Sequence, residues 1–312
     1  MHRTRNPFTI GLLGCGLWGR RILGDLCALG ARVHVVDVDA SARAQALAAG
    51  AMTAVTTLDQ ADTCNGWVIA TPASEHLASL RLLADAGVPL LCEKPLCIDA
   101  AQARGIETLG LADCHMLDVW RYHPAVEKLG TLASSGTLGT PLGLRSTRIN
   151  WTSPRTDVDS LANLAPHDIS IYREVFAGAW PEPASAFFEH DQDGNVRSAW
   201  MQWRGGPWML SELGNRSPLR RRELRLHGED AVAIWDAASP ATLVIARGDA
   251  DDQLEASERQ NVPLDTSTAL RRQLQAWLDW IGGDGPPPRS SLADGLRAFA
   301  SIERMRELGK RA

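Results

Sequence analysis

Short apolar runs alternate with amphipathic segments over the first third of the chain. The apolar runs predict buried strands and lie at 8–14, 31–39, 66–72 and 88–95. Apolar residues recur at helical spacing at 17–29, 41–50 and 74–87. Fully apolar strands that alternate with helices are typical of a parallel sheet covered on both faces. The helix at 41–50 is expected to have Ser41 as its N-cap and to end at Gly50.

The pattern changes at about residue 120. Helices are predicted at 121–136 and from Pro166 to Gly178, because proline is tolerated in the first turn of a helix. Further strands are predicted at 142–151, 183–191, 196–203, 208–213, 221–228, 231–237 and 242–247. Turn-forming sequences at 191–196 and 204–206 predict hairpins, and helices are predicted at 268–283 and 292–308. These elements predict an α+β domain with a large, open, mostly antiparallel sheet.

The length of 312 residues is sufficient for two domains. The change of pattern divides the chain into residues 1–121 and 122–312, with C-terminal helices that could pack back on the first domain. The composition, 45% hydrophobic and 22% charged, is typical of a globular protein. The net charge of −5 gives no reason to expect a nucleic acid or an anionic membrane as a partner.

Targeting signals and cysteines bear on the compartment. No apolar run approaches the ~20 residues that span a bilayer. The N-terminal sequence lacks the apolar core of a signal peptide. The six cysteines form no C-x-x-C pair and lie mostly in apolar segments, as reduced core residues do. These observations predict a cytoplasmic protein without a metal site.

A glycine motif connects the first predicted strand to the first helix. The motif residues are Gly14, Cys15, Gly16, Leu17, Trp18 and Gly19, and Asp37 follows the next strand. In a dinucleotide-binding loop the three glycines permit a tight turn, close approach of the pyrophosphate, and close packing of helix on strand. The helix N-terminus attracts phosphate. Asp37 can accept hydrogen bonds from the adenosine ribose and repels a 2′-phosphate, so the motif favours NAD over NADP.

A charged pair, Glu93 and Lys94, ends the apolar run at 88–95 and precedes Pro95. Ligands of open α/β sheets bind at the carboxyl ends of the strands, which would give Lys94 a role at the cofactor. An exposed ion pair at a strand end would have the same sequence, and such pairs are common and weak.

These motifs together resemble one family, that of glucose–fructose oxidoreductase, inositol dehydrogenase and MocA. The resemblance covers nearly the whole chain and includes the glycine motif, Thr71-Pro72 with His76, the sequence C-E-K-P-L, and the segment around His167. It implies a Rossmann domain, an NAD(P)-dependent oxidoreductase activity, and a lysine held by a strained or cis proline turn that points it at the nicotinamide. Thr71, Pro72, His76, Glu93 and Lys94 would then belong to the cofactor site.

The chemistry of alcohol oxidation explains the residue types. A proton acceptor must take the hydroxyl proton while hydride leaves for the nicotinamide. His167 suits this role because its unperturbed pKa is ~6.5, and a place in the first helical turn would keep the ring neutral. Lys94 can stabilise a developing alkoxide. The family usually has an aspartate where this chain has Asn163, four residues before the histidine, and an amide cannot take up a proton.

The remaining candidates are possible substrate contacts. Asp168 points about 100° away from His167 on a helix, so it is not assumed to replace the missing aspartate. Arg148, Asn150 and Arg155 could bind a carboxylate or phosphate, or could be ordinary strand-face residues. Arg121 and Tyr122 lie near the predicted domain junction, where they would line the site or pack in the core.

The expected function is hydride transfer between NAD and a hydroxyl of a sugar or nucleotide sugar, because the segment around His167 is similar to the family branch that acts on such substrates. Two alternatives stay open: a non-catalytic NAD-sensing regulatory protein, which Asn163 favours, and a glycosidase that uses bound NAD transiently. Apolar residues on both faces of 198–203 and 207–213 predict a homodimer or homotetramer formed through the open sheet.

Overall fold

The computed structural model describes residues 8–151, 157–248 and 258–309. The chain forms two compact units, one of Met1–Val119 with Leu270–Arg297 and one of Trp120–Ala269 with Ala298–Ala312. We call them the first and the second unit. Their C-terminal boundary falls inside helix α8 (Leu292–Gly309). Among the described helices, none has the length and apolar character needed to cross a membrane.

The first unit contains a six-stranded sheet in the order β3-β2-β1-β4-β5-β6, and its paired strands are parallel. The strands are β1 (Thr9–Leu13), β2 (Arg32–Val36), β3 (Thr53–Val55), β4 (Gly66–Ile69), β5 (Leu90–Glu93) and β6 (Cys114–Leu117). The helices are α1 (Leu17–Ala28), α2 (Ala40–Ala48), α3 (His76–Leu83), α4 (Ala100–Glu107) and α7 (Ala269–Ile281). The predicted parallel Rossmann sheet is confirmed, and the direction of strand addition reverses between β1 and β4.

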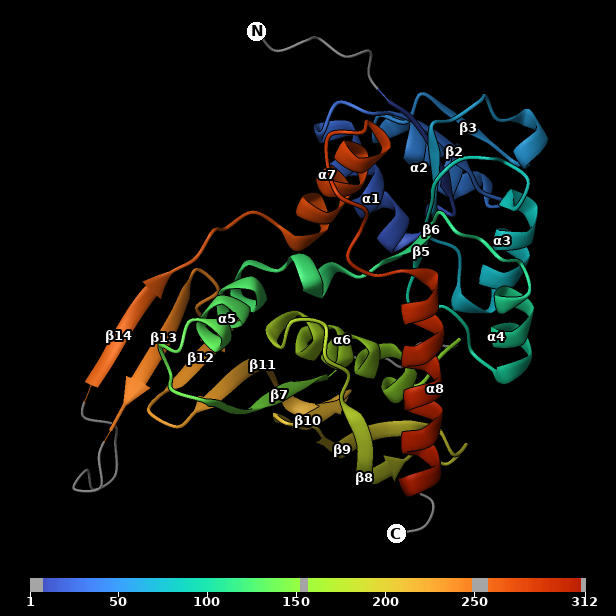
Figure 1. Ribbon diagram of the computed structural model, residues 1–312. Helices are drawn as coiled ribbons and strands as arrows, with labels where there is room; N and C mark the ends of the chain where they lie inside the picture. The colour runs from blue at the N-terminus through green and yellow to red at the C-terminus, as the bar shows by residue number, and fades with distance from the viewer. Residues whose placement is uncertain (1–7, 152–156, 249–257, 310–312) are drawn as a thin grey trace, which may run out of the picture. The chain divides into compact units, whose positions relative to one another are not determined.

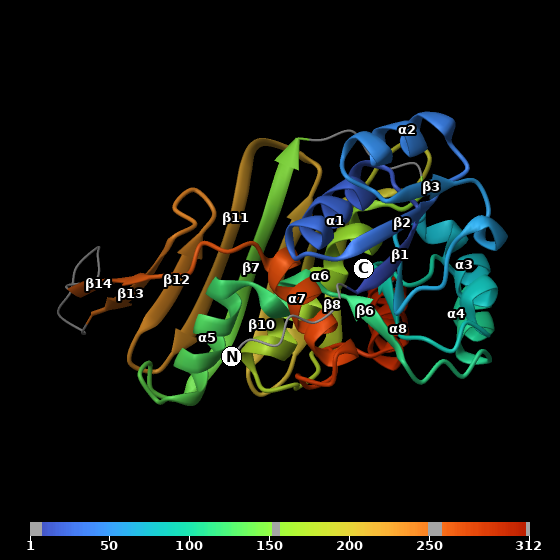
Figure 2. The same ribbon diagram turned by 90° about the horizontal axis from the view of Figure 1, so that it is seen from above.

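Helix α7 comes from the far end of the sequence and completes the core of the first unit. Figures 1 and 2 show it beside α1. Leu274 and Trp277 are fully buried in the same apolar cluster as Ile22 and Val68. An ion pair between Arg271 and Asp25 of α1, at 2.8 Å, lies outside this cluster. The Rossmann core of this chain therefore includes a segment that follows the second unit in sequence.

The N-cap predicted for α2 is wrong by two residues. The helix begins at Ala40, and the carboxylate of Asp39 accepts hydrogen bonds from the backbone N–H groups of Ser41 and Ala42. A carboxylate carries two acceptor oxygens and a negative charge that suits the helix N-terminus, so Asp39 caps the helix and Ser41 lies inside its first turn.

The second unit contains an eight-stranded sheet in the order β14-β13-β12-β11-β7-β10-β9-β8. The strands are β7 (Pro141–Trp151), β8 (Glu182–His190), β9 (Val196–Arg204), β10 (Trp208–Gly214), β11 (Arg216–Gly228), β12 (Val232–Asp236), β13 (Thr242–Arg247) and β14 (Glu258–Pro263). Neighbouring strands are antiparallel except for β7 and β10, which confirms the mostly antiparallel sheet. The helices α5 (Pro124–Ser134) and α6 (Ser160–Val175) lie on one face (Figure 1).

Helix α6 is longer than its sequence predicts. It begins at Ser160, with Asp159 as N-cap, and Pro166 lies inside it. A proline has no N–H to donate to the carbonyl four residues earlier, but the helix continues through the defect. His167 therefore lies beyond the first turn. The expectation that the helix N-terminus keeps its ring neutral is wrong, because that effect is confined to the first turn.

Candidate active site

The glycine loop turns the chain from β1 into α1. Gly14 adopts a φ of +89°, which side chains other than glycine rarely adopt. A Cβ built on Gly19 would lie 2.4 Å from the carbonyl oxygen of Gly14, whereas one on Gly16 would meet no atom of the described residues within 4 Å. The chain's own packing thus requires glycine at positions 14 and 19. At Gly16 the missing side chain leaves open space at a helix N-terminus, where the pyrophosphate of a dinucleotide fits.

Asp37 is half-buried and is held against this loop. Its Oδ2 accepts a 2.6 Å hydrogen bond from the Cys15 N–H, and its Oδ1 accepts one of 2.8 Å from the Asp39 N–H. Arg43 donates to the carbonyl oxygens of Asp37 and Val38 at 2.8 and 3.0 Å. Each carboxylate oxygen can accept more than one hydrogen bond, so Asp37 can still receive the ribose hydroxyls of a dinucleotide.

Thr71, Pro72 and His76 follow the end of β4. His76 is buried, and its ring nitrogens lie 3.1 Å from the Thr71 carbonyl oxygen and 3.2 Å from that of Leu96. The Thr71 and Ser79 hydroxyls are 3.1 Å apart. His76 therefore ties the end of β4 to the segment that follows Lys94 and Pro95. These two contacts of its side chain are with backbone carbonyl oxygens. A role of His76 in the cofactor site would therefore be to position this backbone.

Glu93 explains how a charged pair is accommodated at the end of a buried strand. It is only 7% exposed. One carboxylate oxygen accepts a hydrogen bond from the indole N–H of Trp18, and the other accepts one from the Lys94 N–H at 3.0 Å. Trp18 stands in the first turn of α1, so Glu93 connects the glycine loop to the backbone of Lys94. Lys94 is half-buried, and its bond to Pro95 is cis, as the family resemblance implies.

Helix α6 carries the second group of candidates. Asn163 and His167 are four residues apart, so they lie on the same side of the helix, and both are half-buried. The ring of Trp120 meets that of His167 edge-on, with centroids 6.2 Å apart. The Nδ1 atom of His167 is buried.

Asp168 and Arg148 form an internal pair beneath α6. Asp168 is completely buried and accepts a 2.8 Å hydrogen bond from the Ser146 hydroxyl, and Arg148 approaches it at 3.8 Å. The guanidinium of Arg148 lies 4.3 Å from the ring centroid of Trp120. Burial raises the pKa of Asp168 and lowers that of Arg148 to about 10. Such a pair packs the helix against β7, and neither side chain is on the surface.

The other candidate substrate residues are placed differently. Arg121 is buried and pairs with Glu174 of α6 at 3.1 Å. Tyr122 is buried, and Asn150 is half-buried near the end of β7. Arg155 lies outside the described residues. Within the described part of the chain, no three His, Cys, Asp or Glu side chains come together as metal ligands.

Three side-chain contacts in this region were not predicted from the sequence. The Trp18 indole, the Trp120 ring and the Ser146 hydroxyl act through partners far away in sequence. The N-cap at Asp159 could have been predicted, because an aspartate followed by residues of good helix propensity is a typical N-cap. The helix was instead predicted to start at Pro166.

Several known proteins are similar to this chain in sequence. The model of the GFO_IDH_MocA oxidoreductase family, described as an NAD-binding Rossmann fold, matches residues 8–110. The chain is 25% identical to UDP-N-acetylglucosamine 3-dehydrogenase of Acidithiobacillus ferrooxidans over 94% of this chain and 96% of that one. It is 31% identical to a myo-inositol dehydrogenase of Streptomyces leeuwenhoekii, but that match covers only 48% of each protein.

Solved structures show the same fold over the whole length. The structure of the Acidithiobacillus ferrooxidans enzyme matches with a TM-score of 0.82 at 23% identity, over 98% of this chain and 99% of that one. Levoglucosan dehydrogenase in complex with NADH and levoglucosan matches with a TM-score of 0.81 at 17% identity, over 98% of each. Residues 8–110 of this chain are thus similar to the NAD-binding Rossmann domain of the Gfo/Idh/MocA oxidoreductase family, and the whole chain has the fold of these solved dehydrogenases.

Proposed function

We propose that this protein transfers hydride between NAD and a secondary hydroxyl of a sugar or nucleotide-linked sugar. The observation that carries the proposal is the buried Glu93 carboxylate, which joins Trp18 of the glycine loop to the backbone of Lys94. It anchors a cationic side chain at the carboxyl end of a strand in an NAD-binding sheet. The names of the relatives, a UDP-N-acetylglucosamine dehydrogenase and inositol dehydrogenases, support a polyhydroxylated substrate.

Each residue has one role in this reaction. Lys94 donates a hydrogen bond to the substrate oxygen and stabilises negative charge as it develops there. His167 accepts the hydroxyl proton at Nε2. Asn163 orients the substrate through its amide, without taking a proton. NAD, when bound to the glycine loop and Asp37, supplies the acceptor for the hydride that leaves the same carbon.

Substitution of the two proposed catalytic residues tests the assignment. In a Lys94→Ala variant, kcat should fall by about 10²–10³, with NAD affinity unchanged, because the lost interaction is made mainly in the transition state. Lys94→Arg should not restore it, because a planar guanidinium does not replace a compact ammonium. His167→Ala should cost a similar factor and flatten the acid limb of the pH–rate profile. Lys128→Ala, on α5, is the matched control. Unimpaired turnover by a folded Lys94→Ala protein would contradict the proposal.

One observation favours a second candidate function. Asn163 stands where a charged residue is usual in the family, and a sensor needs to bind NAD without turning over a substrate. Absorbance of NADH with a panel of sugars separates the possibilities. Net NADH formation supports the dehydrogenase, and NAD binding without turnover supports the sensor. A released sugar without net NADH identifies a glycosidase.

We also propose that two or more copies associate through the open face of the sheet in the second unit. Phe187, Trp200 and Leu210 are 65, 43 and 43% exposed on neighbouring strands. With Arg145 and Glu212 they line an open hollow of about 490 Å³. Apolar side chains gathered on a sheet face suit a self-complementary interface.

We also propose a cytoplasmic location, which the chemistry of the thiols supports. All six cysteines are free thiols, and all but the half-buried Cys27 are buried. Burial raises the pKa of Cys15 and Cys64 to about 11 and that of Cys114 to about 12, which suppresses thiolate formation. Such core thiols suit a reducing compartment.

A further inference from the structure

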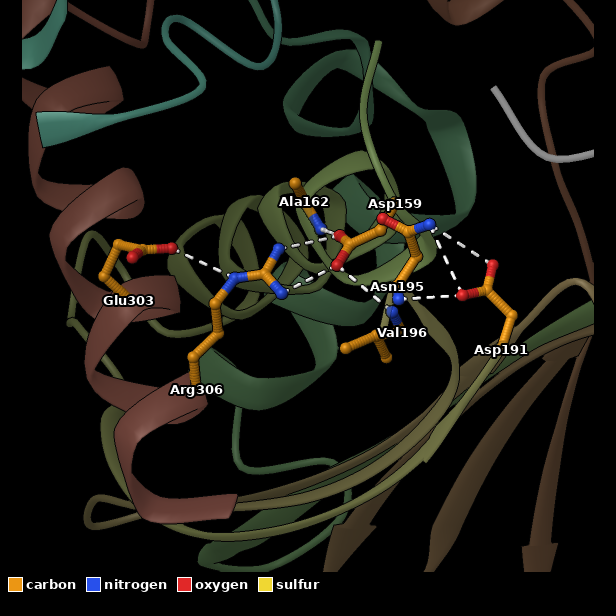
Figure 3. Close-up of polar contacts among 7 residues, drawn as sticks. All are labelled: Asp159, Ala162, Asp191, Asn195, Val196, Glu303 and Arg306. Atoms are coloured by element: carbon orange, nitrogen blue, oxygen red, sulfur yellow. Dashed lines mark hydrogen bonds and ion pairs between the residues drawn. The ribbon is translucent and has the colours of Figure 1, made fainter. Parts of the chain in front are cut away.

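Asp159 is a carboxylate of the second unit that accepts four hydrogen bonds from three separate segments of the chain (Figure 3). Its Oδ1 accepts hydrogen bonds from the Ala162 N–H at 2.9 Å and from Arg306 Nη2 at 2.7 Å. Its Oδ2 accepts from Arg306 Nη1 at 2.6 Å and from the Val196 N–H at 3.3 Å. The side chain is only 8% exposed. One carboxylate thus joins the start of α6, the start of β9 and the end of α8.

The partner of Asp159 is itself fixed. The third nitrogen of the guanidinium, Nε of Arg306, donates to Glu303 at 3.0 Å, one turn earlier on α8. Burial acts to lower the pKa of Arg306, but the hydrogen bonds and charges of Asp159 and Glu303 outweigh it and raise the pKa overall. On the other side, Asp191 accepts from the Asn195 N–H at 2.9 Å and holds the turn that leads into β9. A helix cap alone would not need these additional hydrogen bonds.

An N-cap needs only one acceptor for one N–H group and contributes about 1 kcal/mol. A bidentate guanidinium–carboxylate pair adds a fixed direction, because both N–H···O bonds must stay parallel. Asp159 would cap α6 equally well without Arg306. The pair with Arg306 therefore constrains where the start of α6 lies, beyond the fact that it is helical.

The constraint matters because Pro166 lies inside α6. It has no N–H, so the Ala162 carbonyl loses its usual helical partner, and a proline inside a helix is a point where the helix bends. The turns before Pro166 are thereby less firmly joined to the rest of α6. Asn163 lies in those turns, and His167 follows the proline directly. The buried Leu161 and Ala165 pack this part of the helix in the core, and the pair of Asp159 with Arg306 adds a contact of fixed direction.

We propose that Asp159 and Arg306 are a positioning pair that fixes the N-terminal part of α6, so that Asn163 and His167 keep the relative orientation that the reaction needs. The inference rests on the proposed function for the role of these two residues. Neither Asp159 nor Arg306 touches the substrate in this scheme. The C-terminal helix thereby takes part in catalysis through a single guanidinium.

Chemical rescue tests the pair. In an Arg306→Ala variant, kcat should fall about 10-fold, because displacements of less than 1 Å in a catalytic group already slow a reaction. NAD affinity should stay within about twofold, because the residues proposed to bind NAD are unaffected. Millimolar guanidinium should restore kcat, since Arg306 is partly exposed and a small cation can reach the gap, whereas tetramethylammonium should not. Arg306→Lys should remain impaired, because it keeps the charge without the two-pronged geometry.

Arg304→Ala is the matched control, because Arg304 lies on the same helix in an exposed pair with Glu307. A merely structural role for Arg306 would lower the melting temperature and leave kcat of the folded protein unchanged, which would overturn the inference. The ring 1H–15N resonances of His167 give a readout without turnover. They should shift in Arg306→Ala and return with guanidinium. If the wild type oxidises no sugar, the proposed function fails, and unchanged His167 resonances are then the result that overturns the positioning pair.

Discussion

At the residue scale, glycine is required for different reasons at the three positions of the loop. Gly14 is required by its positive φ and Gly19 by the carbonyl oxygen that faces it, whereas no described residue occupies the space beside Gly16. Two are thus needed for folding, and we expect the third to be needed for the ligand. The same residue type is therefore present in one motif for two independent reasons.

We therefore expect Gly16→Ala and Gly19→Ala to fail in opposite ways. Gly16 has a φ of −65°, which alanine adopts, so Gly16→Ala should keep the melting temperature and weaken NAD binding about 10-fold or more, because the methyl group occupies the pyrophosphate space. Gly19→Ala should lose roughly 1–3 kcal/mol of unfolding free energy, because its Cβ overlaps the Gly14 carbonyl. Urea unfolding and fluorescence titration with NADH measure both quantities. Equal losses of stability in the two variants would contradict this division.

Asp37 supports a prediction on cofactor choice. Its carboxylate is held at the glycine loop by the Cys15 N–H, where it would face the 2′-phosphate of NADP. NAD should bind more tightly than NADP, and Asp37→Ala should narrow the difference by removing the repulsion. The exposed Asp85, changed to alanine, controls for net charge. Equal affinities for the two cofactors in the wild type would refute the role of Asp37.

At the element scale, α7 is the part of the first unit that the Rossmann pattern does not contain. Its Trp277 is fully buried, and the ring lies against the position where Gly66 has no side chain. Trp277→Ala should therefore lower the unfolding free energy by about 3–5 kcal/mol, the usual cost of a large cavity. Trp151→Ala, at a largely exposed position on β7, should cost far less. Urea unfolding of the two variants gives the comparison, and equal costs would show that α7 adds little to the core.

At the scale of the whole molecule, the open sheet face should decide the oligomeric state. The ring of Trp200 lies 5.8 Å from that of Phe187, and its indole N–H donates to Glu212 at 3.3 Å. Trp200→Glu would place a second carboxylate beside Glu212 and remove the aromatic pair. We expect this variant to be monomeric by light scattering at micromolar concentration, with the wild type a dimer or tetramer. Leu82→Glu, on α3, replaces an apolar residue that is even more exposed than Trp200, and it should change nothing. A monomeric wild type would rule out the interface.

Stability should also depend on pH through a buried histidine. Burial lowers the pKa of His115, against the opposing effect of Asp113 and Asp294, and its Nδ1 has no hydrogen-bond partner among the described residues. Below about pH 6.5 the unfolded chain takes up a proton that the folded His115 resists. The unfolding free energy should therefore fall as the pH decreases through this range and gain nothing from His115 above it.

His115→Phe should flatten this dependence, because it keeps the edge-on contact with Trp280 and removes the titrating group. The effect of one proton is at most about 1.4 kcal/mol per pH unit. Urea unfolding midpoints at pH 5.5 and 7.5 measure it. The exposed His190, changed to glutamine, should leave the slope as it is. A slope unaltered by His115→Phe would assign the dependence to other groups.

Local patterns in the sequence were sufficient for the features that depend on neighbouring residues. The parallel sheet follows from apolar runs, and the glycine loop and the place of Lys94 follow from short motifs, because each depends on backbone conformation or on the burial of one element. The antiparallel sheet was likewise visible as alternating runs with turns between them. The start of α6 was missed because a strong proline signal outweighed a correct cap at Asp159.

Pairings between distant residues were decided only by the tertiary structure. Arg121 and Arg148 were candidate substrate contacts. Each instead forms a buried ion pair with a residue that lies elsewhere in the chain, Glu174 and Asp168 respectively. The bond from Trp18 to Glu93 and the contacts of Asp159 are likewise formed by segments that meet only on folding. A sequence states which groups carry charge and which faces are apolar. Whether a charge is solvated or buried depends on what packs against it, and that is a property of the folded chain.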